Sequence, residues 1–134
     1  MTLPFVLLIG GIIVEVAIAG ACVTYFLSSS GYGERLAIRA TAAAESGIRD
    51  AMVRITQNKE FTPNGGQTSY SVMQDNNDYA LVTVSRADSG EIYEYIVQSL
   101  GTAVSRQKKF LAVIAVNGTT GQLELESIKE VAVE

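Results

Sequence analysis

The stretch LPFVLLIGGIIVEVAIAGACVTYFL, residues 3–27, decides how the rest of this chain is organised. It is apolar throughout except for one charged residue, Glu15. A helix over these residues would rise by roughly 37 Å, at about 1.5 Å per residue. That length exceeds the hydrocarbon core of a bilayer, which is ~30 Å thick. The stretch therefore predicts a helix that either crosses a membrane once or packs against copies of itself.

A second helical pattern follows the apolar run. Residues 28–33 are rich in Ser and Gly, and they form either a short break or a weak part of one continuous helix. Over residues 34–55, apolar and small residues recur at steps of three and four, which indicates one face of a helix. That face comprises Leu36, Ala40, Ala43, Ala44, Gly47, Ile48, Ala51, Met52 and Ile55. Its many alanines allow another element to pack closely against it.

The remainder of the chain has the pattern of strands joined by short turns. Alternating side chains predict strands near 70–72, 78–86, 91–100, 104–116 and 122–133. Turns are expected at 87–90 and at Asn117-Gly118, Gly101 is expected to end the third strand, and the apolar run 110–116 predicts a central strand. Strands connected this closely should form an antiparallel meander that covers the alanine-rich helix face. The predicted fold class is α+β, a long N-terminal helix packed on a small antiparallel sheet.

Composition narrows the function classes. The 134 residues include 10 Lys+Arg and 14 Asp+Glu, and the formal net charge is −4. This mild acidity does not indicate a nucleic-acid partner, which requires a clustered basic surface. Histidine is absent, and Cys22 is the one cysteine, so the usual catalytic triads and most zinc sites are excluded. We expect a hydrophobic helix at 1–33, a globular domain at 34–134, no enzymatic activity, and no catalytic, cofactor or metal site.

Two polar motifs resemble binding or modification sites but are better explained as turns. Residues 75–78, Asp-Asn-Asn-Asp, are rich in oxygen ligands but lack the glycine and distal glutamate of an EF-hand, so we interpret them as a solvated turn. Residues 117–119, Asn-Gly-Thr, match an N-glycosylation sequon but are also a strong hairpin signal. We favour the turn in both cases. Cys22 is interpreted as a small apolar packing residue.

Small residues in the apolar run suit helix packing. A proline in the first turn of a helix costs nothing, because its N–H would be unsatisfied there in any case. Each interior glycine weakens a helix by about 1 kcal/mol relative to alanine, yet it allows close helix approach or local unwinding. A small-xxx-small pair favours tight helix–helix contact. The expected assembly residues are Pro4, Phe5, Gly10, Gly11, Glu15, Ala17, Gly20 and Ala21.

Glu15 is the unusual member of this set. Near the centre of a bilayer a charged carboxylate costs a few kcal/mol unless it is protonated or paired. An ionisable residue in such a run is therefore a functional candidate. We favour a pairing role for Glu15 over an acid that stays neutral in lipid.

Three short motifs, at residues 1–9, 42–51 and 99–102, carry a resemblance to a known family. Residues 1–9, MTLPFVLLI, resemble the start of a mature type IV pilin, where a Met or aromatic residue is followed by Thr-Leu and an apolar run. Residues 42–51, AAAESGIRDA, are similar to the AAEAGIxDA stretch of minor pilins. Residues 99–102, SLGT, followed by basic residues and an apolar strand from Phe110, are similar to the late strand pair of such pilins. Together these motifs lie in both the predicted helix and the predicted sheet and extend over most of the chain.

The resemblance implies a lollipop-shaped subunit of a surface filament. The precursor would insert in the inner membrane, a prepilin peptidase would remove a short basic leader, and Met1 would become the methylated N-terminus. No Lys or Arg precedes Arg35, which fits a leader that has already been removed. An ATP-driven assembly machine would then polymerise the subunits into a helical homo-oligomer. Such filaments serve adhesion to host or neighbouring cells, motility or DNA uptake.

One residue departs from the family pattern. Most major pilins have a glutamate at the position of Phe5, where it is thought to pair with a neighbour's N-terminal amine. In this chain Glu15 is the only acid in the run, so either it pairs in another register or the subunit resembles pilins that lack the acid. We also expect local melting of the helix between Gly10 and Gly20 on assembly. The alternatives are a pseudopilin of a type II secretion-like system and a single-span membrane protein with a small binding domain.

Overall fold

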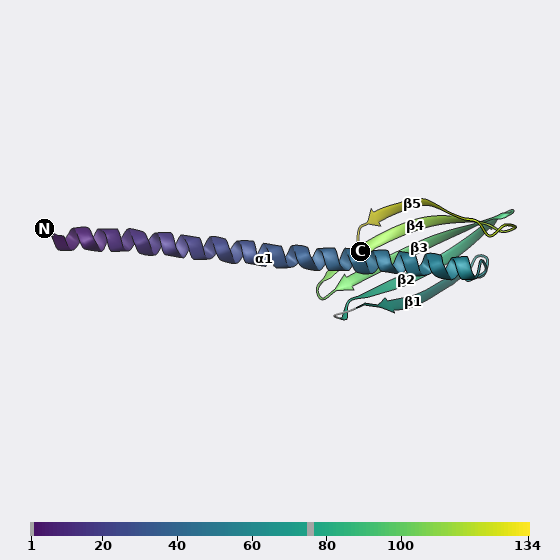
Figure 1. Cartoon of the computed structure of the whole chain (residues 1–134), viewed down its shortest axis with the longest axis horizontal. Helices are drawn as coiled ribbons and strands as arrows, with labels where there is room; N and C mark the ends of the chain where they lie inside the picture. Colours follow the sequence, from purple (N-terminus) through teal and green to yellow (C-terminus); the bar gives the residue numbers. More distant parts are fainter. Residues whose placement is uncertain (1, 75–76) are drawn as a thin grey trace. The chain divides into compact units, whose positions relative to one another are not determined.

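The computed structural model describes residues 2–74 and 77–134. Within these ranges the chain forms one long helix followed by five strands (Figure 1). The elements are α1 (Thr2–Gln57), β1 (Gln67–Met73), β2 (Tyr79–Ser89), β3 (Ile92–Ala103), β4 (Arg106–Asn117) and β5 (Leu123–Val131). The chain divides into two compact units, Met1–Arg35, here called the helical unit, and Leu36–Glu134, here called the globular unit. The predicted α+β class, a long N-terminal helix with an antiparallel sheet, is confirmed.

Helix α1 continues through the Ser/Gly-rich residues 28–33. These residues are therefore a weak part of one continuous helix and not a break between two helices. Low intrinsic propensity there costs only a fraction of a kcal/mol to about 1 kcal/mol per residue, which continuous backbone hydrogen bonding on both sides outweighs. The helix is also continuous from Gly10 to Gly20. Melting of that segment on assembly stays a prediction. After Gln57 the chain turns away, and the Asn58 side chain accepts a hydrogen bond from the Glu60 amide at 3.0 Å.

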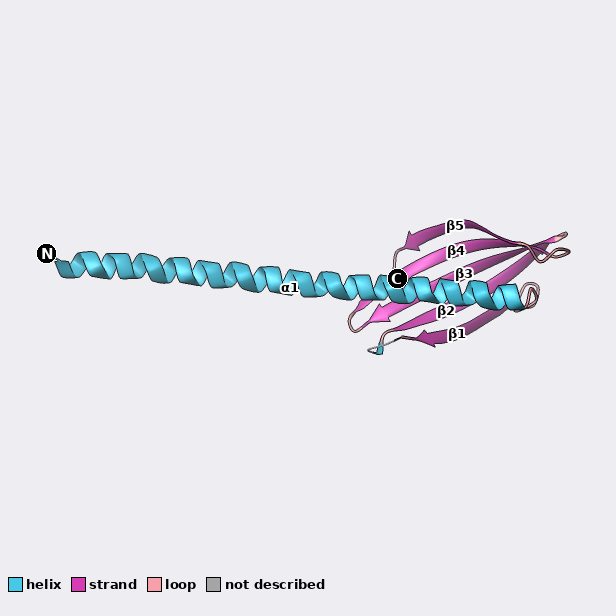
Figure 2. Ribbon diagram, in the orientation of Figure 1, coloured by secondary structure: helices cyan, strands magenta, loops and turns pink. Residues whose placement is uncertain are grey.

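The sheet has the strand order β1-β2-β3-β4-β5, and every neighbouring pair is antiparallel (Figure 2). The predicted meander is confirmed. Residues 110–116 belong to β4, which pairs with both β3 and β5 and is thus an interior strand, although β3 holds the middle position. The apolar run is continuous because one face of β4 is buried with Ala112 and Ile114, while Leu111 and Val113 on the other face are half-buried.

Two predicted strand ends are displaced. Strand β2 extends to Ser89, so the turn expected over 87–90 is shorter and places Gly90 at φ +68°. Strand β3 passes through Gly101, which was expected to end it. Gly101 is needed for a different reason: an added Cβ there would lie 2.1 Å from the carbonyl oxygen of Ala40. The glycine permits the helix backbone to rest on the strand, and β3 ends instead before a turn at Val104.

The core of the globular unit lies between the second half of α1 and one face of the sheet (Figure 1). The predicted helix face is confirmed: all of its members are buried except Met52, which is partly buried. Opposite it are Val82, Val84, Tyr95, Val97, Ala112, Ile114 and Val116, each exposed by 1% or less. Gly47 allows the helix to approach β2 and β3, because an added Cβ would meet Ser99 at 2.3 Å. The alanines and Gly47 bring the helix close, and the valines and Tyr95 fill the remaining space.

Candidate functional site

The apolar half of α1 is the most exposed apolar surface in the described chain. Every residue from 3 to 30 is exposed, and Leu7 and Phe26 retain 70% and 71% of their accessible surface. This helix is long and apolar enough to cross a membrane. Fully burying one Leu, Ile or Phe side chain stabilises a protein by about 1.5–3 kcal/mol, so an exposed segment this apolar fits insertion in a membrane.

The predicted assembly residues all lie on this helix. Pro4, Phe5, Gly10, Gly11, Glu15, Ala17, Gly20 and Ala21 are helical and exposed. A Cβ added at Gly10, Gly11 or Gly20 would find nothing within 4 Å. These glycines are therefore not required by packing within the subunit. Met1, the predicted processing and methylation site, lies outside the described residues.

The two remaining predictions in the helical unit concern Cys22 and Glu15. Cys22 is exposed rather than packed within the chain. Glu15 is exposed on the helix, and no ion pair joins it to any residue in the ranges 2–74 and 77–134.

A groove on the globular unit was not predicted. It has a volume of about 410 Å³ and runs between α1 and strands β4 and β5. Its apolar lining comprises Ile48, Met52, Phe110, Leu125 and Ile128, and Glu45 and Arg49 also border it. The latter two side chains are 52% and 82% exposed, with 4.0 Å between carboxylate and guanidinium. A second hollow of about 510 Å³ shares Arg49 and Met52 and follows α1 to Gln57.

A register shift explains why the sequence did not indicate this groove. Strict alternation along β5 would place Leu125 and Ile128 on opposite faces. In the structure the pairing with β4 shifts between Val113 and Ile114, so that Leu125 opposes Ile114 and Ile128 opposes Ala112. Both β5 side chains therefore lie on the helix-facing side of the sheet. A bulge of this kind leaves no clear mark in a single sequence.

Asp78 joins the sheet to the helix and is unavailable as a calcium ligand. Its carboxylate accepts two hydrogen bonds from Arg39, Nε to Oδ2 at 2.8 Å and Nη2 to Oδ1 at 2.7 Å. The Asp78 side chain is only 6% exposed. Residues 75 and 76 of the motif lie outside the described residues. No group of His, Cys, Asp or Glu that could hold a metal occurs in the part of the chain that the structure describes.

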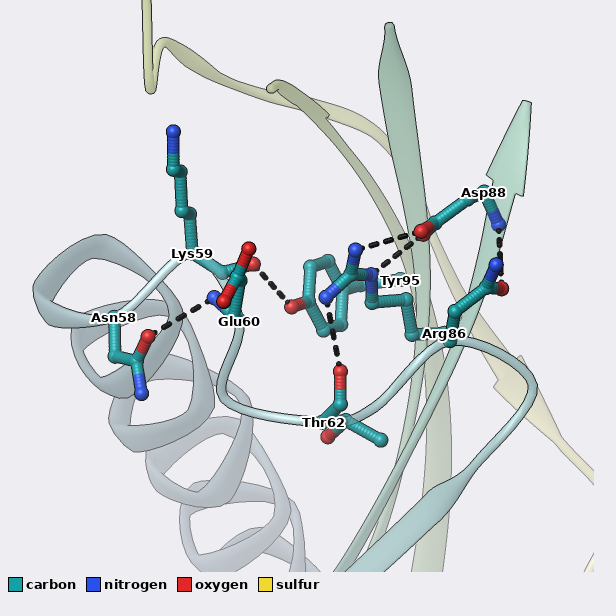
Figure 3. A network of polar contacts seen from close by, with 8 residues as sticks. Asn58, Lys59, Glu60, Thr62, Arg86, Asp88 and Tyr95 are labelled. Atoms are coloured by element: carbon teal, nitrogen blue, oxygen red, sulfur yellow. Dashed lines mark hydrogen bonds and ion pairs between the residues drawn. The ribbon is translucent and has the colours of Figure 1, made fainter. Parts of the chain in front are cut away.

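A polar network holds the loop after α1 against the sheet (Figure 3). The Tyr95 hydroxyl donates to the carbonyl oxygen of Lys59 at 2.6 Å. Arg86 donates to both carboxylate oxygens of Asp88, at 2.5 and 2.6 Å, and to the Thr62 carbonyl at 3.2 Å. Its guanidinium also lies 3.9 Å from the centre of the Tyr93 ring. These contacts satisfy groups buried under the loop, and they have no reactive geometry.

Two tyrosines of the globular unit have perturbed acidity. Burial raises the pKa of the Tyr95 phenol, and the same cause, reinforced by the nearby Asp50 carboxylate, raises the pKa of Tyr70. Both phenols therefore stay protonated at neutral pH and act as hydrophobic groups with a polar tip.

The Asn117 sequon is part of a hairpin loop, as predicted. The Asn117 side-chain oxygen accepts hydrogen bonds from the amides of Thr119 and Thr120, both at 2.9 Å. Its carbonyl accepts another from Gly121 at 2.7 Å. The loop is longer than a two-residue turn, and Gly121 adopts φ +74° within it.

Comparison of the chain with profiles of known protein families, with curated proteins and with solved structures gave no significant match. The long apolar helix and the antiparallel sheet are compatible with a pilin-like fold.

Proposed function

We propose that this chain is a structural, non-enzymatic subunit of a type IV pilus-like filament. The observation that carries the proposal is the exposure of every residue from 3 to 30 on a helix whose side chains are almost all apolar. Before assembly the inner membrane shields this helix. After assembly the same surface packs against the helices of other subunits, which form the filament core. The finished filament lies on the cell surface.

The groove supports polymerisation. The groove has a volume of about 410 Å³ and a mostly apolar lining beside α1. The apolar side chains of a neighbouring subunit's helix could fill it. The small residues of that helix allow it to approach closely. One surface of the subunit thus meets a different surface of the next, and repetition of such a heterologous contact builds an open filament.

The continuity of α1 argues against a tethered binding domain. A domain displayed on a membrane anchor is commonly joined to it by a flexible polar linker. Here α1 extends from Thr2 to Gln57 across the boundary between the two units at Arg35. A pseudopilin of a secretion system shares this organisation and is the second candidate. It differs in forming a short periplasmic piston rather than a long surface fibre.

The test is to express the chain with its assembly machinery, shear the cells, and image the released material. A filament reconstruction should contain this chain with its N-terminal helix at the centre. Abundant long filaments favour a major pilin, and short filaments confined to the envelope favour a pseudopilin. A chain that stays a detergent-soluble monomer in the membrane refutes both.

A matched pair of variants connects the filament to the groove. Leu125→Glu places a charge in the groove, whereas Leu81→Glu places the same charge on the opposite face of the sheet. The two leucines are similarly exposed, at 39% and 45%, so both variants should fold. We expect Leu125→Glu to abolish filaments and Leu81→Glu to retain them. Equal filament yields from both would exclude the groove from the interface.

A further inference from the structure

The charged side chains of the helical unit are Glu15, Glu34 and Arg35, and none of them forms an ion pair within residues 2–74 and 77–134. Glu15 is exposed within the apolar run. Arg35 is the first basic residue of the sequence, is exposed, and forms no ion pair within residues 2–74 and 77–134. Leaving a carboxylate unpaired in an apolar environment is costly, and an arginine can satisfy both of its oxygens at once. Glu15 and Arg35 therefore have opposite charges, and each can satisfy the hydrogen bonds of the other.

Their spacing prevents pairing within one helix but suits two helices. Arg35 follows Glu15 by 20 residues. On an α-helix this separation corresponds to roughly 30 Å along the axis and a rotation of roughly 200°. The two side chains thus point to nearly opposite sides of the same helix.

Two parallel copies of a helix contact each other through opposite sides. If a copy is translated to the right of the original, the original contacts it with its right side, and the copy contacts the original with its left side. If the copies are also displaced along their axes by roughly 30 Å, Glu15 of one lies level with Arg35 of the other. Every copy then gives its Glu15 to one neighbour and its Arg35 to the next, which is a heterologous contact that repeats without closing.

A pair of glycines selects the same displacement independently. Gly11 lies four residues before Glu15, and Gly31 lies four residues before Arg35, so each shares a helix face with its charged residue. The displacement that aligns the charges also places Gly11 opposite Gly31. A Cβ at either position would find nothing within 4 Å in the subunit, so packing of the subunit does not require either glycine. Facing glycines would let the two backbones approach closely and bring the guanidinium within reach of the carboxylate.

We propose that Glu15 of each subunit pairs with Arg35 of a parallel second copy, displaced by roughly 30 Å along the helix axis. This inference rests on the proposed filament function and names the partner of Glu15. The other arginines of α1 have carboxylate neighbours within the subunit: Arg39 binds Asp78, Arg49 lies 4.0 Å from Glu45, and Arg54 binds Asp50 at 2.6 Å. Copies inserted to the same depth in a membrane are not displaced in this way, so the pair forms only during polymerisation.

A charge exchange tests the pairing. Glu15→Arg and Arg35→Glu alone should each lower the yield of sheared filaments by at least about tenfold, because each leaves two like charges in contact. The double variant restores an opposite pair and should return the yield to near the wild-type level. Glu15→Arg with Arg106→Glu is the matched control, since it compensates the net charge at an exposed arginine outside both the helix and the groove and should not restore assembly. Rescue by the control as well as by the exchange would overturn the pairing.

The amount of subunit in the membrane fraction is measured for every variant. If Glu15→Arg reduces insertion, the neutral variants Glu15→Gln and Arg35→Gln decide the matter. A double neutral variant no worse than either single one supports the pair, and independent losses that multiply overturn it.

Crosslinking provides a geometric readout. In a Cys22→Ser background, filaments of the Glu15→Cys, Arg35→Cys double variant should give a ladder of dimers, trimers and longer species on a non-reducing gel after oxidation. Each single-cysteine variant should stay monomeric. Filaments that form normally but show neither charge rescue nor a ladder would refute the Glu15–Arg35 pair alone. Failure of the wild-type chain to form any filament would refute the proposed function and the pair with it.

Discussion

The close contact between α1 and β3 gives the sharpest prediction on stability. In Gly101→Ala the added methyl carbon would lie 2.1 Å from the Ala40 oxygen, 2.5 Å from the Ala44 nitrogen and 2.9 Å from the Ala44 methyl group. The first two are backbone atoms, so no side-chain rotation relieves the overlap. An ordinary contact of 3.4 Å requires helix and strand to separate by about 1.3 Å. A gap of roughly 1 Å forfeits up to about half of the dispersion energy across the buried alanine face.

We therefore expect Gly101→Ala to lower the free energy of unfolding by at least about 3 kcal/mol, the upper end of the range for overpacked cores. Guanidinium unfolding of the full chain in detergent, followed by near-ultraviolet circular dichroism of the tyrosines, measures this quantity. Gly90→Ala is the matched control: nothing lies within 4 Å of its added methyl group, and its φ of +68° is the remaining source of strain. That strain should cost about 1–2 kcal/mol. A Gly101→Ala variant as stable as Gly90→Ala would refute the described packing of helix on strand.

Three further predictions concern the polar contacts of the globular unit. Tyr95→Phe removes the hydroxyl that donates to the Lys59 carbonyl at 2.6 Å, and should cost about 1–2 kcal/mol in the same assay and speed proteolysis of the loop after α1; unchanged cleavage would contradict this. Asp78→Asn breaks the bidentate ion pair with Arg39, whose side chain is 36% exposed, and should lower the free energy of unfolding by about 1–3 kcal/mol. The double variant Asp78→Asn, Arg39→Met should recover part of that loss, because it no longer leaves the guanidinium without its partner carboxylate. Because burial raises the pKa of Tyr70 and Tyr95, the unfolded chain loses these phenol protons first, so their contribution to stability is complete below about pH 10 and declines as pH rises further. Unfolding at pH 8 and pH 11 should show a decline that is smaller in Tyr70→Phe and Tyr95→Phe, and equal declines in all chains would exclude the tyrosines as its source.

The parts of the fold that follow from periodicity were predictable. The buried face of α1 was identified because a helical period of 3.6 residues separates its alanines from the charged residues around them. Strands β2 and β3 were predictable because alternating burial is visible in their sequences, whereas the apolar run 110–116 indicated β4. Their ends were less predictable: Gly101 has the local pattern of a strand breaker, and only the approach of the Ala40 backbone shows why a glycine is placed there.

The contacts between distant residues were not predictable. Arg39 and Asp78 lie 39 positions apart, and neither local sequence indicates the other. The groove depends on a one-residue shift between β4 and β5, which moves Ile128 to the helix-facing side. Glu15 and the small residues of the apolar run were identified as candidates because they are unusual in their surroundings. The partners that we propose for them belong to other molecules and leave no trace in the sequence of one chain.

The strand order of the sheet bears on how the protein reaches its folded state. Every strand pairs with the one that precedes it along the chain, from β1 to β5. If the C-terminal portion crosses a translocation pore in sequence order, each strand can pair with the preceding strand as soon as it emerges. No strand remains unpaired for long, so aggregation-prone intermediates are short-lived. If the N-terminal helix is anchored in a membrane, as proposed, this strand order allows the globular unit to fold progressively as it emerges on the other side.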